Sequence, residues 1–255
     1  MVKFKSVIAA LLAAGTVASA SESGILSYRA QRSFDAGKFA KGYGQLERAL
    51  LASRKESDLL SEGRVLIAMG QIRTMSLDLD FADSLLSIVR EDALDKNTRT
   101  QLAKTKIAVL NAREKFDEAS RVCSNFDKDV LKKADEPTQA GFYGECAIAD
   151  ATRNNARAQE SLKMVGKCTD KKGGYYAFIA ARLADLSGSS DADSLYRSAE
   201  EKAIKANKPY NTATILYHRS QLKTTPKKEA ADLKLRCKNA FELMGLPNNS
   251  KRCAE

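Results

Sequence analysis

The chain has 255 residues, of which 44% are hydrophobic, and it carries a formal net charge of +10. A single histidine excludes a metal centre built from several histidines, and no stretch has the spacing GxSxG, HExxH, GxGxxG or GKS/GKT. These features give no support to an enzyme, and we expect no bound metal or cofactor.

The first twenty residues have the pattern of a cleaved secretory signal peptide. A short basic start with Lys3 and Lys5 precedes an apolar run from Val7 to Val17, and the small residues ASA occupy positions 18–20. The apolar run is too short to span a bilayer, which argues against the alternative of a membrane anchor. We therefore expect cleavage after about Ala20, and a secreted or periplasmic protein.

Residues 21–245 are predicted to be helical almost throughout. Ala, Leu, Lys, Arg, Glu and Asp dominate this region, and no segment alternates apolar and polar residues with the period of a strand. Pro137, Pro209 and Pro226 suit the first turn of a helix, where a missing N–H has no cost. Gly245 with Pro247 suits the end of the last helix, so residues 246–255 are expected to form a C-terminal tail.

An apolar pattern recurs along this helical region. Phe39, Gly42, Leu46 and Ala49 follow each other at steps of three, four and three, which places them on one face of a helix. Related patterns recur at intervals of about 34 to 42 residues. A second amphipathic stretch precedes each of the later patterns, so each pair of stretches would form a helical hairpin, and we expect about six hairpins. The later copies are Phe81, Ser84, Ile88; Phe116, Ala119, Cys123, Phe126; Ala158, Leu162, Val165; and Ala192, Tyr196, Ala199.

The stretch from Ala30 to Ala49, with Gly37 in its turn, resembles the tetratricopeptide repeat (TPR). In that family, small residues let the two helices of a hairpin approach, and large residues fill the gap to the next hairpin. The proline that closes each repeat of the family is missing here, and Arg54 stands near its place. The resemblance implies an all-α, right-handed superhelix of about six stacked antiparallel hairpins (an α-solenoid) over residues 21–245. The alternative is an irregular helical bundle.

The resemblance also implies where a partner would bind. Stacked hairpins form a long concave groove that commonly holds a peptide or another protein, and the first helices of the hairpins line it. Gln31, Phe34 and Asp35 stand where the family usually places ligand-facing residues. Phe34 has an equally good interpretation as a core residue of the first hairpin.

Positive charge gathers near the C-terminus. From Glu201 onward there are 12 basic and 5 acidic residues, and Lys202, Lys205 and Lys208 recur at steps of three, as on one helix face. Such a stripe could bind an anionic wall polymer, lipid headgroups or an acidic protein. The alternative is a solvated surface that keeps the protein soluble. We do not expect nucleic acid to be a partner, because no recognised nucleic-acid-binding module accompanies the charge.

Five cysteines follow the expected cleavage point, and export favours disulfide bonds between them. An antiparallel turn could bring Cys123 and Cys146 together, and Cys237 with Cys253 would tie the tail to the last helix. Cys168 is then left over, either as a thiol, as an intermolecular link or as a buried inert residue.

Three functions are consistent with these features. The first is a non-catalytic exported scaffold or adaptor that binds a protein or peptide. The second is a cell-envelope component that holds an anionic polymer or membrane surface through its basic C-terminal helices. The third is an enzyme acting on cell-wall carbohydrate, because a carboxylate pair leaves little trace in a sequence. His218 is expected to be a surface or packed histidine, and Asp78 or Asp80 a helix cap.

Overall fold

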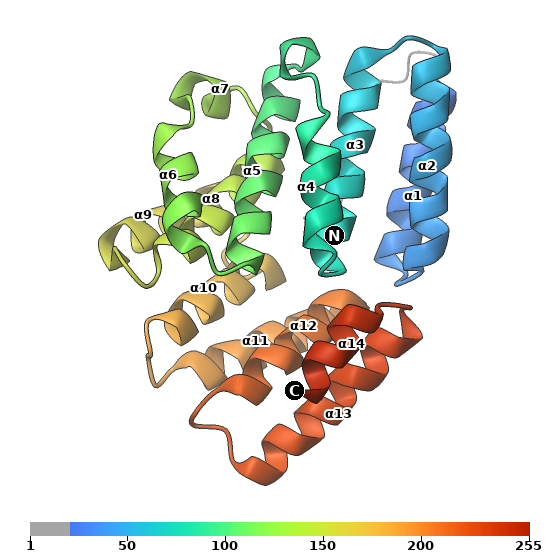
Figure 1. Ribbon diagram of the computed structural model, residues 1–255. Coiled ribbons are helices and arrows are strands. Elements are labelled where there is room, and N and C mark those ends of the chain that lie inside the picture. The colour runs from blue at the N-terminus through green and yellow to red at the C-terminus, as the bar shows by residue number, and fades with distance from the viewer. Residues whose placement is uncertain (1–20) are drawn as a thin grey trace. The chain divides into compact units, whose positions relative to one another are not determined.

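The computed structural model in Figure 1 describes residues 21–255, all of which lie in helices or in the connections between them. The predicted signal peptide lies outside the described residues. The described part forms fourteen α-helices and one short 3-10 helix, with no strand, and consecutive helices pack against each other. The prediction of an all-α fold is therefore confirmed. No helix in this part is both long and apolar enough to cross a bilayer.

The chain divides into two compact units, residues 1–142 and 143–255. Unit 1 contains α1 (Glu22–Asp35), α2 (Phe39–Lys55), α3 (Leu59–Met75), α4 (Leu79–Ser87), the 3-10 helix η2 (Glu91–Ala93), α5 (Lys96–Ala112), α6 (Phe116–Asn125) and α7 (Lys128–Lys132). Helix α8 (Glu136–Asp150) runs through the boundary. Unit 2 contains α9 (Asn155–Cys168), α10 (Gly174–Leu186), α11 (Ala192–Lys205), α12 (Pro209–Gln221), α13 (Lys227–Leu243) and α14 (Pro247–Ala254).

One kind of three-residue turn joins many of these helices. Its middle residue has φ between 50° and 73°, and its last residue donates a backbone hydrogen bond of 2.8 to 3.0 Å to a carbonyl five residues earlier. The same last residue is the N-cap of the next helix, so each turn ends one helix and starts another without a gap. The middle residues are Gly37, Ser57, Leu77, Glu114, Asn207 and Gly245.

These turns fix which face of the following helix is buried. The first residue of each following helix comes two positions after the middle residue of the turn, so Leu79 in α4 corresponds to Phe39 in α2. Ala82, Leu86 and Val89 then occupy the places of Gly42, Leu46 and Ala49, and all three are buried. The predicted copy Phe81, Ser84 and Ile88 was wrong, because Phe81 and Ile88 are 42% and 55% exposed.

Small residues let the helices of a hairpin approach in unit 1. A methyl group at Gly42 of α2 would lie 2.5 Å from the Phe34 ring of α1, and one at Gly70 of α3 would lie 2.8 Å from Leu86 of α4. The small residue thus sits on the second helix in one hairpin and on the first helix in the next. This pairing of small with large residues agrees with the packing expected from the TPR resemblance.

Unit 2 has a core of the same character. Tyr196 of α11 is fully buried among Ala177 and Ala181 of α10 and Ile215 of α12. At the C-terminus, Gly245 ends α13 as expected, but Pro247 begins the further helix α14. The segment 246–255, expected to be a tail, is therefore largely a helix that packs on α13, because proline suits its first turn and a disulfide fixes its far end.

Candidate interaction surfaces

The residues predicted to face a partner in the first hairpin are mostly buried. Gln31 is 7% exposed and Phe34 is 4% exposed, while Asp35 is half-buried at the end of α1. Phe34 packs against Gly42 and lies 5.6 Å from the Phe39 ring, which agrees with its interpretation as a core residue. Gln31 and Phe34 therefore offer almost no surface to a partner.

The opposite side of α1 is exposed and carries large side chains. Ile25 is 40% exposed and Tyr28 is 61% exposed, and Arg29 and Arg32 are exposed beside them. Steps of three and four place Ile25, Tyr28 and Arg32 on one side of the helix. Tyrosine and arginine are over-represented among the residues that dominate binding energy in protein interfaces. We call Ile25, Tyr28, Arg29 and Arg32 the α1 face.

Acidic residues of the run 78–83 bind arginines. Asp78 occupies the N-cap position of α4, as expected, but its carboxylate makes no capping hydrogen bond to the helix. It accepts a hydrogen bond of 3.1 Å from Arg73. The Arg73 guanidinium lies 4.0 Å from the Tyr43 ring centroid and 4.7 Å from that of Phe81. Asp80 and Asp83 both pair with Arg113. The contacts of Arg73 with Asp78 and Phe81 hold the hairpin of α3 and α4 together, and the pairs with Arg113 join α4 to the end of α5, so the run is structural.

The predicted lysine stripe Lys202, Lys205 and Lys208 does not lie on one helix. Helix α11 ends at Lys205, and Lys208 is the N-cap of α12 beyond the turn at Asn207, so this part of the prediction was wrong. Lys205 also donates a hydrogen bond of 2.6 Å to Glu201. The pattern failed because Asn207 adopts a left-handed conformation that breaks the helix between the second and third lysine.

Carboxylates of the C-terminal helices gather around one buried arginine. The side chain of Arg219 in α12 is only 4% exposed and donates to Asp193 at 3.1 Å, to Glu200 at 2.5 Å and to Glu229 at 2.9 Å. Partial burial raises the pKa of Asp193, but hydrogen bonds from Arg197 and Arg219 outweigh it and hold that pKa below the usual 3.8. This network links α11, α12 and α13.

His218 is packed inside unit 2. Its ring stacks parallel to that of Tyr196 at 5.9 Å, and its Nδ1 lies 3.1 Å from Nη1 of Arg182. Because a guanidinium only donates, Nδ1 accepts this bond and the imidazole is neutral. Burial lowers the pKa of His218 well below 6.5, and the positive charges of Arg182 and Arg252 lower it further. Arg182 also donates to Asp185 of the same helix at 2.7 Å. The contacts of His218 in α12 with Arg182 in α10 and with Tyr196 in α11 hold these three helices together.

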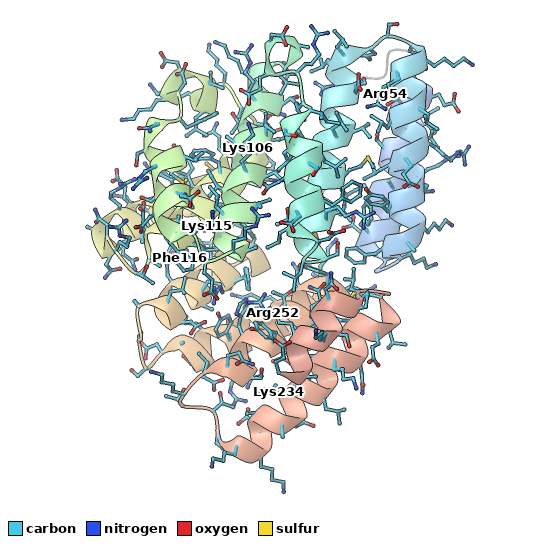
Figure 2. The ribbon with its side chains drawn as sticks, in the orientation of Figure 1. Arg54, Lys106, Lys115, Phe116, Lys234 and Arg252 are labelled. Atoms are coloured by element: carbon cyan, nitrogen blue, oxygen red, sulfur yellow. A yellow bond between two sulfur atoms is a disulfide. The ribbon has the colours of Figure 1, made fainter. Side chains whose placement is uncertain are left out.

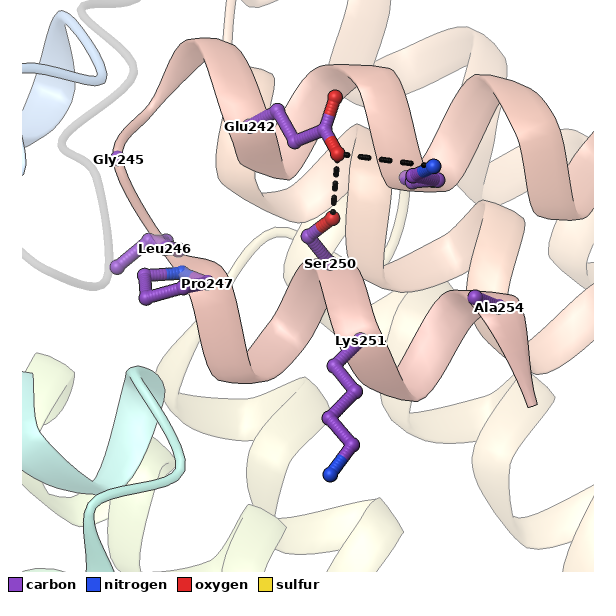
Figure 3. A pocket seen from close by; sticks show the side chains of 8 residues that line it. Glu242, Gly245, Leu246, Pro247, Ser250, Lys251 and Ala254 are labelled. Carbon is purple, nitrogen blue, oxygen red and sulfur yellow. Dashed lines mark hydrogen bonds and ion pairs between the residues drawn. The ribbon is translucent and has the colours of Figure 1, made fainter.

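A hollow of about 430 Å³ lies between the end of α13 and α14 (Figure 3). Its lining includes Lys238 and Glu242 of α13, Leu246 of the connecting turn, and Ser250 and Lys251 of α14. Glu242 accepts a hydrogen bond of 3.2 Å from the Ser250 hydroxyl and lies 3.8 Å from the Lys238 ammonium. The hollow thus has a lysine on each of its two helices.

The cysteines agree with an oxidising environment. Cys123, Cys146, Cys237 and Cys253 are all disulfide-bonded, as expected, and Cys237 pairs with Cys253. Cys168 is half-buried and keeps its thiol. Disulfides persist in exported proteins and are rare in the reducing cytosol.

The chain matches no protein-family model and no curated protein. Within residues 21–255, no group of three or more His, Cys, Asp or Glu side chains is placed to hold a metal ion.

Sequence reasoning missed the exposed side of α1 because it took the ligand-facing positions from the TPR resemblance. The spacing of Ile25, Tyr28 and Arg32 was a signal in the sequence itself, since large apolar residues there fall on the side opposite Leu26 and Ala30. No sequence signal marks Arg219 as the centre of a buried network, because its three carboxylate partners come from two other helices.

Proposed function

We propose that this protein is an exported, non-catalytic scaffold or adaptor whose hairpins are a divergent form of the TPR and bind a protein or peptide partner. The observation that carries the proposal is the repeated turn that joins α1 to α2, α3 to α4 and α5 to α6 with the same backbone geometry. Repeated helical hairpins build extended surfaces suited to binding. In that family the hairpins stack into a right-handed superhelix, and we extend this arrangement to the present hairpins.

The α1 face is the part of unit 1 that we assign to partner binding. Tyr28 and Ile25 supply apolar area that is open to solvent, and the two arginines beside them supply hydrogen-bond donors. A contact anchored by Tyr28 should persist at high salt, because apolar burial is not screened by ions. This assignment replaces Gln31 and Phe34 as the expected contact residues.

Export through a cleaved signal peptide is part of the same proposal. The disulfide-bonded cysteines support an oxidising destination such as the periplasm or the extracellular medium. Cell fractionation followed by N-terminal sequencing of the purified protein tests this step. We expect the mature chain to start near Ser21, and a chain that retains Met1 in the cytosol would contradict it.

Affinity capture from the native source tests partner binding. The C-terminally tagged protein is purified from its own cells, washed at high salt, and the co-purified protein is identified, expressed alone and titrated against the tagged chain. We expect Tyr28→Ala to weaken this binding by about 10-fold or more, as truncation of an interface anchor does. Leu51→Ala is the matched control, because Leu51 is 66% exposed on α2 of the same unit. Equal binding by the two variants would refute the assignment of the α1 face.

A further inference from the structure

We propose that Arg252 of α14 is an anchor for a carboxylate, one that the protein partner carries on an aspartate or glutamate side chain. This site deepens the proposed function, on which it rests, because it gives the chemistry of a second contact with the partner. It lies in unit 2 and is separate from the α1 face.

Arg252 is an exception among the arginines that the helices cover. Seven arginines of residues 21–255 are buried or half-buried, and six of them bind a carboxylate. These six are Arg64, Arg73, Arg113, Arg157, Arg182 and Arg219. The guanidinium of Arg252 forms no ion pair and no hydrogen bond with the described part of the chain. Because a charge that is partly withdrawn from water is costly unless an opposite charge meets it, this arginine is suited to an anion from outside the chain.

The guanidinium of Arg252, which Figure 2 labels, is held in place by its neighbours. It lies over the Tyr217 ring of α12, with its central carbon 4.2 Å from the ring centroid. Stacking uses the flat face of a guanidinium and leaves the N–H groups at its edge open to an acceptor. The adjacent Cys253 is bonded to Cys237 of α13, which fixes this end of α14. A donor held in advance loses little freedom when a ligand binds.

The groups around Arg252 do not neutralise it. His218 is neutral, and the positive charge of Arg252 adds to the effect of burial in lowering the pKa of His218. Burial raises the pKa of Tyr210 to about 12, and the charges of Arg252 and Glu145 act on that pKa in opposite directions. Glu145 thus lies in the same neighbourhood, but no ion pair joins it to Arg252. The charge of Arg252 is therefore left without a counter-ion in residues 21–255.

One open charge fits a carboxylate better than a phosphate group. Arg182, the other arginine near His218, is already matched by Asp185. A carboxylate has one negative charge on two oxygens in one plane, and these accept two parallel N–H bonds from a guanidinium. A phosphate group has about two negative charges and suits a cluster of arginines. The Tyr217 hydroxyl makes no hydrogen bond within the described residues, so it offers a second donor at the rim of the stacked ring.

Nuclear magnetic resonance of the full-length chain tests the site without the partner. The Nε–Hε signal of Arg252 is assigned by its loss in Arg252→Lys, a variant that keeps the charge. The unchanged chain is then titrated at constant ionic strength with acetyl-Gly-Glu-Gly-amide, with its neutral analogue acetyl-Gly-Gln-Gly-amide, and with inorganic phosphate. We expect the glutamate peptide to shift the signals of Arg252 and of the Tyr217 ring saturably, and the neutral peptide to leave them in place.

Three outcomes of this titration would overturn the proposal. The first is an equal shift with both peptides, and the second is the absence of a saturable shift with the glutamate peptide. The third is saturation by phosphate at a lower concentration than by the glutamate peptide, which would assign the site to a different anion.

The partner identified by affinity capture supplies the second test. We expect Arg252→Met to weaken its binding by about 30-fold or more, as the loss of one member of a buried charge pair does at an interface. Lys251→Met is the matched control, because it removes the same charge from the neighbouring position of α14, where the side chain is exposed. It should bind like the unchanged chain, and circular dichroism checks that both variants keep their helices.

The two tests separate this site from the proposed function. Equal binding of the partner by Arg252→Met and Lys251→Met, with Tyr28→Ala still weakening it, would overturn the present proposal and leave the proposed function standing. A chain that binds the glutamate peptide at Arg252 but captures no protein would support the carboxylate site and contradict the proposed function.

Discussion

Replacing the buried Arg219 of unit 2 should strongly destabilise the protein. Arg219→Met removes three charged hydrogen bonds, to Asp193, Glu200 and Glu229. Glu200 is only 8% exposed, so its charge loses a partner in a place that water reaches poorly. Removing one partner of a buried ion pair costs about 3–5 kcal/mol. We expect a value near the lower end, about 3 kcal/mol, because Arg236 still lies 3.1 Å from Glu200.

The same network supplies a matched control. Arg197 binds Asp193 at 2.7 Å and Glu229 at 2.6 Å, but its side chain is 53% exposed. Ion pairs at an exposed surface contribute about 0–1 kcal/mol, so Arg197→Met should cost less than about 1 kcal/mol. Urea unfolding followed by far-ultraviolet and tyrosine near-ultraviolet circular dichroism measures both losses.

The effect of Arg219→Met should also depend on pH. The pKa of Asp193 lies below 3.8 in the folded protein, so its ion pairs contribute stability above that pH, and this contribution is lost as the pH falls through the folded-state pKa. Removing Arg219 removes part of that contribution. The difference in unfolding free energy should therefore be largest at neutral pH and shrink below about pH 4. Equal losses for the variants of Arg219 and Arg197, or a loss for Arg219→Met that grows on acidification, would refute the reasoning.

Three further predictions concern single features of the fold. Gly245→Ala should destabilise the protein by about 1 kcal/mol, because Gly245 has φ +71°, which disfavours a residue with a side chain. Gly44→Ala inside α2 should instead stabilise it by up to about 1 kcal/mol. A methyl group meets no atom within 4 Å at either position, so thermal melts of the two variants compare backbone conformation alone. Changing both Cys237 and Cys253 to Ser should cost about 3 kcal/mol in urea unfolding, because the bond closes a loop with a sequence separation of 16. His218 should stay neutral through pH 6 in a proton NMR titration. Because its folded-state pKa is lowered from 6.5, stability should fall by up to about 1.4 kcal/mol per pH unit as the pH drops below 6.5, and His218→Phe should remove this slope.

The helical class and the hairpin pattern could be predicted from the sequence because they depend on local properties. Helix-forming residues and apolar steps of three and four identify a helix face without knowledge of its neighbours. The second helices of the first and third hairpins were located correctly, since α2 and α6 begin at Phe39 and Phe116, where the predicted pattern begins. Proline at the first position also predicted the start of α12 at Pro209.

The candidate surfaces could not be predicted in the same way, since they depend on which side of a helix its neighbours cover. Gln31 and Phe34 stand at positions that the TPR resemblance assigns to a groove, yet both are buried in the present hairpin. Lys205 and Lys208 share a regular spacing, yet a turn separates them. Spacing predicts a common helix face only where the helix continues. Asn207, followed by Pro209 at the start of α12, was the sequence signal that the helix ends before Lys208.

The four non-glycine turns explain why the repeat is clear in the backbone and faint in the sequence. Ser57, Leu77, Glu114 and Asn207 have φ between 50° and 59°, a conformation that costs an ordinary residue about 1–2 kcal/mol relative to right-handed helix. Local preference therefore disfavours these turns, and the packing of the helices on either side must supply the difference. The turn is thus specified by the faces that it joins, in agreement with the burial of Ala82 and Leu86 on the helix that follows Leu77. A search for glycine finds only Gly37 and Gly245 among the six, whereas a search for paired apolar faces separated by three residues would find the others.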